Sequence, residues 1–156
     1  MILVTAPLTS CDESLPEVSV QVERIRLAKR LWRGKAGDGT EFGFELQTPL
    51  RDADVVHCTA AARYVIRQEP EPVLEVSLEL PPSAAAGIGW AVGNLHLELM
   101  AEATRLLTPD EKPARHLLER LRIPYRVTSA VFRPGRFARG AQAVAAAEEL
   151  GTSHKH

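Results

Sequence analysis

The hydrophobic pattern of the chain changes near residue 70, and a chain that changes its pattern in this way has to fold as two parts. Before the change, apolar residues alternate with polar ones in short runs, which is the period of half-buried strands. After it, alternating runs are separated by segments with the helical period of three to four residues. Residues 67–72 between them hold charges and two prolines, a composition typical of a stiff linker. We expect domains over residues 1–70 and 71–150, and a flexible histidine-bearing tail over 151–156.

The first region is predicted to be a small all-β domain. A Gly-Asp-Gly turn signal at 37–39 separates two of its strands, and no helical period of useful length precedes about residue 80. Aromatic residues make up only 5% of the chain, so the core is expected to consist mainly of aliphatic side chains. The alternating apolar residues of the expected strands are Val18, Val20, Val22, Ile25, Leu27, Phe42, Phe44 and Leu46.

The second region is predicted to have the element order β-α-β-β-α-β, which is the order of a ferredoxin-like domain. The fold class expected for the whole chain is therefore α+β, with the small all-β domain first and the ferredoxin-like domain second. Such a domain places its helices on one face of the sheet and leaves the other face open. The expected elements are a strand at 74–80, a helix at 81–92, a strand from about 95, a hairpin at 101–103 returning through 106–107, a helix at 111–122 and a strand at 125–131.

The second helix of this region has the clearest start signal in the chain. Thr108 at the N-cap, Pro109 in the first turn and Glu111 three residues after the threonine form a predicted capping box. The helix then carries an apolar stripe at the spacing i, i+3, i+4 and i+7. The residues of that stripe are Ala114, Leu117, Leu118 and Leu121.

Composition and motifs argue against several classes of protein. The net charge of −1 argues against a nucleic-acid partner, and no apolar run is long enough to span a membrane. The apolar start of the chain is too short for a signal peptide and lacks a basic region, so a cytoplasmic location is expected. No nucleophile elbow, phosphate loop, zinc-protease or dinucleotide motif suggests an enzyme. Cys11 and Cys58 match no zinc spacing and are expected to be two reduced thiols.

His96 is the candidate metal ligand of the chain. It follows a Gly-Asn pair at 93–94, two residue types that tolerate the left-handed conformation at a helix end. The leucines that alternate over 95–99 predict a strand in which they face one way and His96 faces the other. His96 is thereby expected on the open face of the sheet. A one-residue error in the register would reverse that placement.

Two further histidines, His154 and His156, close the sequence as an i, i+2 pair and are candidate ligands as well. Imidazole is a suitable ligand for nickel, copper and zinc. A nickel ion binds about four to six ligand atoms, however, and a single histidine provides only one of them. The alternative is a histidine at a strand end that only hydrogen-bonds a carbonyl group, and the pattern alone favours that alternative.

The residues around His96 resemble the UreE family of urease accessory proteins. Gly93-Asn94-Leu95-His96 is similar to the Gly-Asn-x-His signature of that family, at the same place between a helix and a strand. Similar residues recur along nearly the whole chain, in the same order. They are 23–31, 38–44 and 50–55 in the first region, and 111–122, Pro124-Tyr125, Phe132 and Pro134 in the second.

The resemblance implies a soluble homodimer that joins through its C-terminal domains, with a peptide-binding type of N-terminal β domain. It implies that His96 meets its symmetry mate and that the pair binds one Ni(II) ion, completed by His154 and His156. Ni(II) is then cargo, with Zn or Cu binding in vitro. The implied partners are the urease apoprotein and the urease accessory GTPase complex. Neither nucleic acid nor a membrane is implied.

The chain departs from the family pattern at several positions. Some members carry histidines where this chain has Ala91, Asp110 and Lys112, and many have a longer histidine-rich tail. Gly135 stands where many members have an acidic residue. We therefore expect fewer auxiliary metal sites here.

Two other classes of function stay open at this point. One is a peptide-binding assembly chaperone or scaffold in which metal binding is incidental, and the other is an enzyme or RNA-binding module built on the ferredoxin-like half. His57 and His116 are expected to be packed or surface residues and not ligands. A basic cluster either docks an acidic partner or, as the pattern favours, is a solvated strand face. Its residues are Arg24, Arg26, Lys29, Arg30, Arg33 and Lys35.

Overall fold

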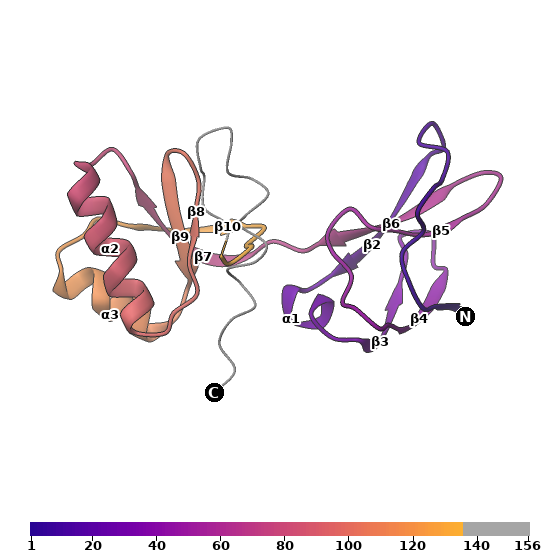
Figure 1. The fold of residues 1–156 in the computed structure, drawn as a ribbon, viewed down its shortest axis with the longest axis horizontal. Helices are drawn as coiled ribbons and strands as arrows, with labels where there is room; N and C mark the ends of the chain where they lie inside the picture. Colours follow the sequence, from indigo (N-terminus) through magenta and orange to yellow (C-terminus); the bar gives the residue numbers. More distant parts are fainter. Residues whose placement is uncertain (136–156) are drawn as a thin grey trace. The chain divides into compact units, whose positions relative to one another are not determined.

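The computed structural model of the chain describes residues 1–135 (Figure 1). Its chain contacts divide it into two compact units, Met1–Pro70 and a second unit that begins at Glu71. The predicted tail, with His154 and His156, lies outside the described residues.

The first unit consists of two small sheets and one helical turn. One sheet has three strands in the order β1-β4-β3, and the other has three in the order β2-β6-β5. The elements are β1 (Ile2–Val4), β2 (Glu17–Val22), α1 (Arg24–Leu27), β3 (Leu31–Lys35), β4 (Glu41–Glu45), β5 (Val55–Cys58) and β6 (Arg63–Gln68).

The core of the first unit joins side chains from both sheets. Phe42 and Phe44 of β4 are completely or almost completely buried, and Trp32 of β3 stacks on Phe44 with 3.8 Å between the ring centroids. Val20 of β2 and Ile66 of β6 close the same cluster from the second sheet. The predicted strand alternation is thus confirmed for β2 and β4.

The prediction of a strand through Ile25 and Leu27 is wrong. These residues form the single turn α1, in which the Leu27 N–H donates to the Glu23 carbonyl at 2.9 Å. The cause is tertiary, because the Val22 carbonyl at the end of β2 accepts the Glu69 N–H and β2 stops there. Leu27 is buried and Ile25 is 68% exposed. One buried residue in four matches the period of a helical turn, whereas a half-buried strand would bury every second residue.

Cys11 and Cys58 form a disulfide, so the expectation of two reduced thiols is wrong. The two cysteines are 47 residues apart, so no local sequence pattern indicates that they pair. The fold brings it together because the loop between β1 and β2 runs back along β5, where the Leu8 N–H donates to the Val55 carbonyl at 2.7 Å. The two Cα atoms lie 6.4 Å apart, an ordinary distance for a disulfide.

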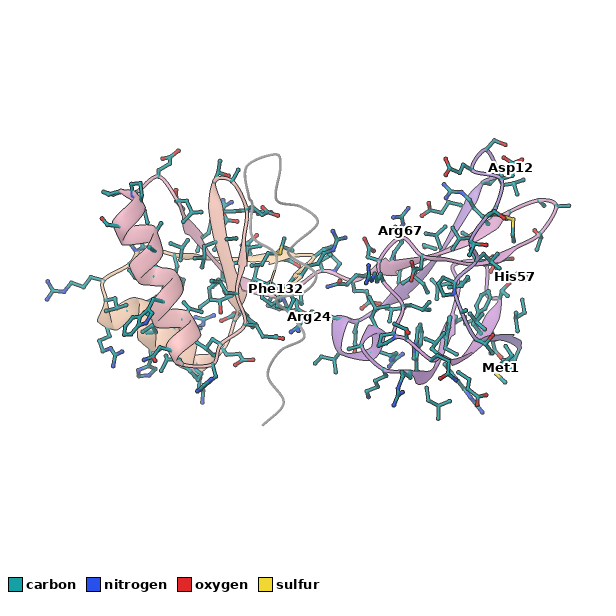
Figure 2. All side chains as sticks on the ribbon, viewed as in Figure 1. Met1, Asp12, Arg24, His57, Arg67 and Phe132 are labelled. Atoms are coloured by element: carbon teal, nitrogen blue, oxygen red, sulfur yellow. A yellow bond between two sulfur atoms is a disulfide. The ribbon has the colours of Figure 1, made fainter. Side chains whose placement is uncertain are left out.

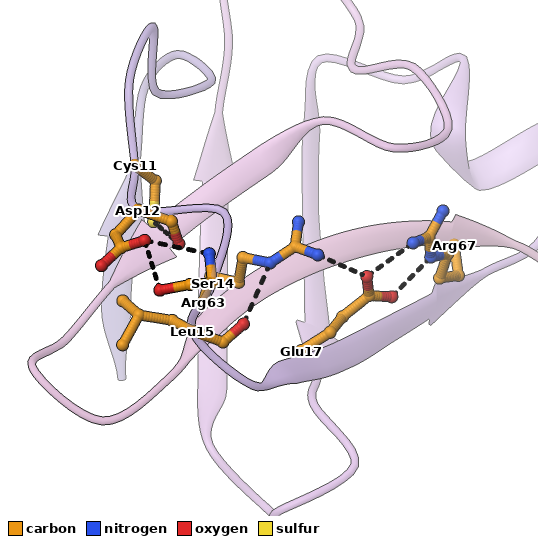
Figure 3. A network of polar contacts seen from close by, with 7 residues as sticks. All are labelled: Cys11, Asp12, Ser14, Leu15, Glu17, Arg63 and Arg67. Atoms are coloured by element: carbon orange, nitrogen blue, oxygen red, sulfur yellow. Dashed lines mark hydrogen bonds and ion pairs between the residues drawn. The ribbon is translucent and has the colours of Figure 1, made fainter.

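The loop that carries Cys11 leads into a polar network between β2 and β6 (Figure 3). Arg67 donates from Nε and Nη2 to the two carboxylate oxygens of Glu17, each at 2.6 Å. Arg63 lies 3.4 Å from the same carboxylate and donates through Nε to the Leu15 carbonyl. The Arg67 hydrogen bonds hold the pKa of Glu17 below its ordinary value, although burial acts in the opposite direction. The two parallel strands are therefore tied by their side chains as well as by their backbones.

The second unit is one four-stranded sheet with two helices. The strand order is β10-β7-β9-β8, and each neighbouring pair is antiparallel. Both helices lie on the same side of this sheet (Figure 1). Taken with the first unit, this makes the chain a mixed α+β protein, as predicted. The elements are β7 (Glu71–Ser77), α2 (Pro82–Asn94), β8 (Met100–Ala101), β9 (Arg105–Pro109), α3 (Lys112–Arg120) and β10 (Arg126–Ala130).

The sheet of the second unit is covered on both faces. On the helix side, Leu74 and Val76 of β7 pack against buried residues of α2 and α3. On the other side, Phe132 packs against Val73, Met100 and Leu107 and is completely buried (labelled in Figure 2). The expected open face is therefore partly closed by the chain that follows β10.

We call this covering segment, residues 131–135, the strap. It runs from the β10 edge of the sheet to the β8 edge, which lies at the other end of the strand order. The Arg133 N–H donates to the Met100 sulfur at 3.2 Å, and the Gly135 N–H donates to the Leu99 carbonyl at 2.8 Å. The described chain thus ends beside the segment that leads into β8.

The predicted capping box of the second helix is wrong. Thr108 lies within β9, is completely buried, and donates its hydroxyl to the Glu98 carbonyl at 2.9 Å. The helix α3 begins at Lys112, after an N-cap residue, Glu111, that makes no side-chain capping bond. The strand continues through Pro109 because Pro109 pairs with Val73 of β7, so sheet pairing overrides the local helix-start signal. The predicted stripe is buried at Ala114, Leu117 and Leu118, but Leu121 is 46% exposed.

Glu75 provides a pH-dependent contribution to the stability of this unit. Burial raises the pKa of the Glu75 carboxyl, but hydrogen bonds from Arg105 and Arg126 outweigh it and set the pKa below its ordinary value of 4.5. A carboxyl whose pKa is lower when folded stabilises the protein above its unfolded pKa, and this stabilisation is lost as the pH falls through the folded value. We therefore expect the free energy of unfolding to decrease below about pH 4.5.

The measurement is urea unfolding at a series of pH values for the natural chain and for Glu75→Gln. The amide cannot titrate, so Glu75→Gln is expected to be less stable near neutral pH and to lose less stability on acidification. Identical pH dependence of the two proteins would contradict the role of Glu75.

Candidate metal centre

His96 lies at the C-terminal end of α2, in a helix-ending turn of the Schellman type. Its backbone has a φ of 56°, which is the left-handed conformation. The His96 N–H donates to the Gly93 carbonyl at 2.9 Å, and the Leu97 N–H donates to the Val92 carbonyl at 3.3 Å. These are the two hydrogen bonds of the Schellman motif, with His96 in the position that glycine usually occupies. The backbone on both sides of His96 is therefore fixed by the end of the helix.

The predicted placement of His96 on a strand, on the open face of the sheet, is wrong. The strand β8 begins only at Met100. The residues at 93–94, expected to take the left-handed conformation, are the last two residues of α2. The physical cause is Leu97, which packs into the core of the helix face beside Val92. A Schellman turn pairs an apolar residue in this way with one inside the helix, and it places the left-handed residue directly before it.

The imidazole of His96 is exposed. Within residues 1–135, its side chain makes no hydrogen bond, ion pair or ring contact. The alternative of a histidine that only hydrogen-bonds a carbonyl is thus not what the structure describes. A left-handed conformation costs a non-glycine residue roughly 1–2 kcal/mol. A histidine at this position therefore lowers the stability of the fold.

The strain at His96 is not by itself a sign of function, because α3 ends in the same way. Arg122 has a φ of 54° and donates its N–H to the Glu119 carbonyl at 3.0 Å, while the Ile123 N–H donates to the Leu118 carbonyl at 2.9 Å. What distinguishes His96 is its chemistry, since a neutral imidazole has a nitrogen lone pair for a metal ion and a guanidinium has none. Arg122 therefore serves as a matched internal control.

The described part of one chain does not hold a complete metal site. Among residues 1–135, no three or more histidine, cysteine, aspartate or glutamate side chains are grouped so that they could hold a metal ion. The predicted ligands His154 and His156 lie outside the described residues. The strap, however, ends close to this position, because Gly135 is hydrogen-bonded to Leu99, three residues beyond His96.

Neither of the two other described histidines belongs to a group of three or more possible metal ligands within residues 1–135. His57 of β5 lies edge-on to the Phe42 ring, with 6.2 Å between centroids, and 5.6 Å from the Tyr64 ring, and is labelled in Figure 2. His116 of α3 is exposed, as predicted, and lines a shallow hollow that also includes Leu95 at the end of α2. Sequence reasoning did not find this proximity, because α2 and α3 are brought together only by the fold.

Comparison with known proteins assigns the chain to a family. A family model described as the C-terminal domain of the UreE urease accessory protein matches residues 71–156, which is more than half of the chain. The chain belongs to the UreE family. Members of this family are urease accessory proteins and not enzymes.

Two relatives carry the name urease accessory protein UreE. The relative from Deinococcus radiodurans is 34% identical over 125 residues, which cover 77% of each chain. The relative from Bifidobacterium longum subsp. infantis is 29% identical over 115 residues, which cover 74% of this chain and 52% of the relative. The chain thus spans about half the length of the Bifidobacterium relative. In the described part of this family member, none of the helices has the length and apolar character needed to cross a membrane.

Proposed function

We propose that the chain is a cytoplasmic nickel metallochaperone that delivers Ni(II) to apo-urease, in concert with the urease accessory GTPase complex. The active form is a homodimer that joins through the second units, which we infer to be ferredoxin-like domains. The His96 side chains of the two subunits bind one Ni(II) ion between them, and His154 and His156 supply further ligands. The single observation that carries this proposal is the exposed imidazole of His96, held on a fixed turn without a partner in the described chain.

The number of available donors supports a site shared between subunits. One imidazole binds a divalent ion weakly, and the described residues hold no cluster to which it belongs. A two-fold axis beside His96 supplies a second imidazole, and the two tails add His154 and His156 of each subunit. This gives enough nitrogen ligands for nickel without any other residue.

The position of the strap supports participation of the tail. Gly135 is hydrogen-bonded to Leu99, so the chain that leads to His154 departs from the His96 end of the unit. An extended chain of the length of residues 136–153 spans roughly 60 Å, which is ample to reach His96 of either subunit. Ligands on separate chain segments also suit a carrier, because they are replaced one at a time when the ion is transferred.

The sequence order of the elements supports the ferredoxin-like assignment. The strand order β10-β7-β9-β8 places the first and third strands of the unit in the centre and the fourth and second at the edges. That arrangement follows from two β-α-β segments folded antiparallel to each other, and it is the arrangement that the resemblance to the family implies.

The test is the substitution His96→Gly, which separates metal binding from folding. Glycine takes the left-handed conformation without strain, so the variant is expected to be more stable than the natural chain by up to about 1 kcal/mol. At the same time it is expected to lose tight nickel binding in a calorimetric titration, because the imidazole is absent. Loss of binding in a protein that is at least as stable cannot be attributed to unfolding.

Arg122→Gly is the matched control, since it relieves the same strain at the end of α3 and leaves His96 in place. It is expected to gain similar stability and to keep nickel binding. A version ending at Leu150 measures the contribution of the tail, and light scattering with and without nickel measures the dimer. Tight binding retained by His96→Gly would refute the proposed site.

Activation of apo-urease separates the proposal from the scaffold alternative. A nickel carrier requires His96, so His96→Gly is expected to support little activation under limiting nickel. A scaffold in which metal binding is incidental would support activation as well with His96→Gly as with the natural chain.

A further inference from the structure

The disulfide between Cys11 and Cys58 lies outside the core of the first unit; Figure 2 shows it as a yellow bond near Asp12. Both cysteines are half-buried, and the residues that follow them, Asp12 and Thr59, are exposed. The core itself is closed by aromatic and aliphatic side chains from both sheets, with no cysteine among them. A small thiol can therefore approach the disulfide, and the packing of the core does not include it.

The segment that the disulfide holds, residues 6–14, has few other attachments. Within residues 1–135, one hydrogen bond joins this segment to a strand, from the Leu8 N–H to the Val55 carbonyl at 2.7 Å. Its other hydrogen bonds are local, such as the one that the Ser14 N–H donates to the Asp12 carboxylate at 2.9 Å. Every residue of the segment except Cys11 is exposed. The disulfide is therefore the strongest attachment of the segment.

The chain on both sides of this segment, and the strand β5 to which it is linked, are anchored without the disulfide. Val4 before the segment is buried and pairs with Phe44 of β4. After the segment, the Pro16 carbonyl accepts the Arg63 N–H at 2.9 Å. In β5, Val56 is buried in the core. Opening the disulfide is therefore expected to free residues 6–14 and to leave both sheets in place.

We propose that Cys11 and Cys58 form a reversible redox site, which a thiol reductant opens and a disulfide oxidant closes, and that opening frees residues 6–14. The inference rests on the cytoplasmic location that is part of the proposed function, because disulfides in that compartment are usually transient and not structural. Exposed disulfides are also the ones that thiols reduce most readily. The inference goes beyond the nickel function, since neither cysteine lies in the unit that carries His96.

Opening of the site proceeds by thiol–disulfide exchange. The thiolate of a small thiol such as glutathione attacks one cysteine sulfur, and a new sulfur–sulfur bond forms while the bond between the two cysteines breaks. The other cysteine leaves as a thiolate and takes up a proton. A second glutathione thiolate then attacks the mixed disulfide and releases the first cysteine, so two electrons pass to the cysteines and oxidised glutathione is formed. Closing reverses both exchanges, with oxidised glutathione as the oxidant.

The first measurement places the full chain, without urea or metal ions, in buffers that differ in the ratio of reduced to oxidised glutathione. Free thiols are trapped by alkylation and counted by mass spectrometry. We expect two free thiols per chain when reduced glutathione is in the large excess of a reducing cytoplasm, and none when oxidised glutathione is in excess. The near-ultraviolet circular dichroism of Trp32, which stacks on Phe44, is expected to be the same in both buffers.

The second measurement follows the release of the segment by NMR relaxation in the same two buffers. The backbone order parameters of residues 8–14 are expected to fall below about 0.6 on reduction, while those of β4 stay near about 0.85. The control is Cys11→Ser/Cys58→Ser, which cannot form the disulfide. Its order parameters over residues 8–14 are expected to be low in both buffers, so any direct effect of glutathione on the rest of the chain is measured separately.

Several results would overturn the proposal. A disulfide that persists in the reducing buffer until urea is added is a structural cross-link, and a dithiol that stays open in excess oxidised glutathione is not a reversible pair. Unchanged order parameters on reduction would show that opening frees nothing, and loss of the Trp32 signal would show that it unfolds the unit. None of these measurements involves nickel, so their failure leaves the nickel proposal in place, and a failed nickel titration leaves their outcome unchanged.

Discussion

Phe132→Ala is expected to lower the free energy of unfolding of the second unit by about 3–5 kcal/mol. Phe132 is completely buried and holds the strap against Val73, Met100 and Leu107. Its truncation leaves a cavity on the sheet face opposite the helices and exposes part of that face to water. The measurement is urea unfolding followed by far-ultraviolet circular dichroism, because the two longer helices, α2 and α3, both lie in this unit.

Val127→Ala is the control for Phe132→Ala. Val127 lies on β10, the strand that precedes the strap, and its side chain is 51% exposed. The substitution Val127→Ala is therefore expected to lower the free energy of unfolding by no more than about 1 kcal/mol. If Phe132→Ala were as mild as Val127→Ala, the strap would not contribute to the stability of the sheet.

Removal of the disulfide is expected to cost the first unit up to about 4 kcal/mol of stability. That is the chain-entropy value for a cross-link between residues separated by 47 positions. The measurement compares the oxidised natural chain with Cys11→Ser/Cys58→Ser in urea, followed by fluorescence. Trp32 is buried in the first unit and Trp90 is 72% exposed on α2. In a Trp90→Phe background, the signal therefore reports the first unit alone.

The second unit provides the control within the same molecule. The helical circular dichroism of α2 and α3 is expected to be lost at the same urea concentration with and without the disulfide. A cost below about 1 kcal/mol in the first unit would show that the cross-link constrains the chain very little.

The features that the sequence predicted correctly are those that depend on local periodicity. The alternation through Phe42 and Phe44 and the order of elements after Glu71 follow from which side chains must be buried, and burial repeats every two or every three to four residues. The mixed α+β class follows from the same patterns. These signals are contained in windows of a few residues, so they need no knowledge of the rest of the chain.

The wrong predictions share a different cause, because each was decided by a distant segment. Thr108 has the sequence of a helix cap but is drawn into β9 by pairing with β7. Cys11 meets Cys58 only because a loop runs back along β5. Phe132 follows the last strand in what reads as irregular chain, yet it covers a sheet face. Contacts of this kind have no local pattern.

At the candidate site, the helix end before His96 was predicted correctly, whereas the conformation of His96 was not. The identity of His96 as the notable histidine came from its neighbours, since Gly93 and Asn94 mark the end of a helix. Its conformation was predicted wrongly, because the packing of Leu97 against Val92 determines which residue turns left-handed. That packing depends on the core of the folded unit and not on the sequence of the turn.

The Schellman turn at His96 has a consequence for the rate at which an ion is handed on. The main chain is pinned on either side of the ring, while the ring itself swings only about two side-chain bonds. Rotation of an exposed side chain takes picoseconds to nanoseconds. Under the proposed function, release of the nickel ion therefore requires neither the opening of a domain nor the unfolding of a segment. If His96 binds the ion as proposed, the slow step is the breaking of the nitrogen–metal bonds, and the ligands of the recipient set its rate by competing for the ion.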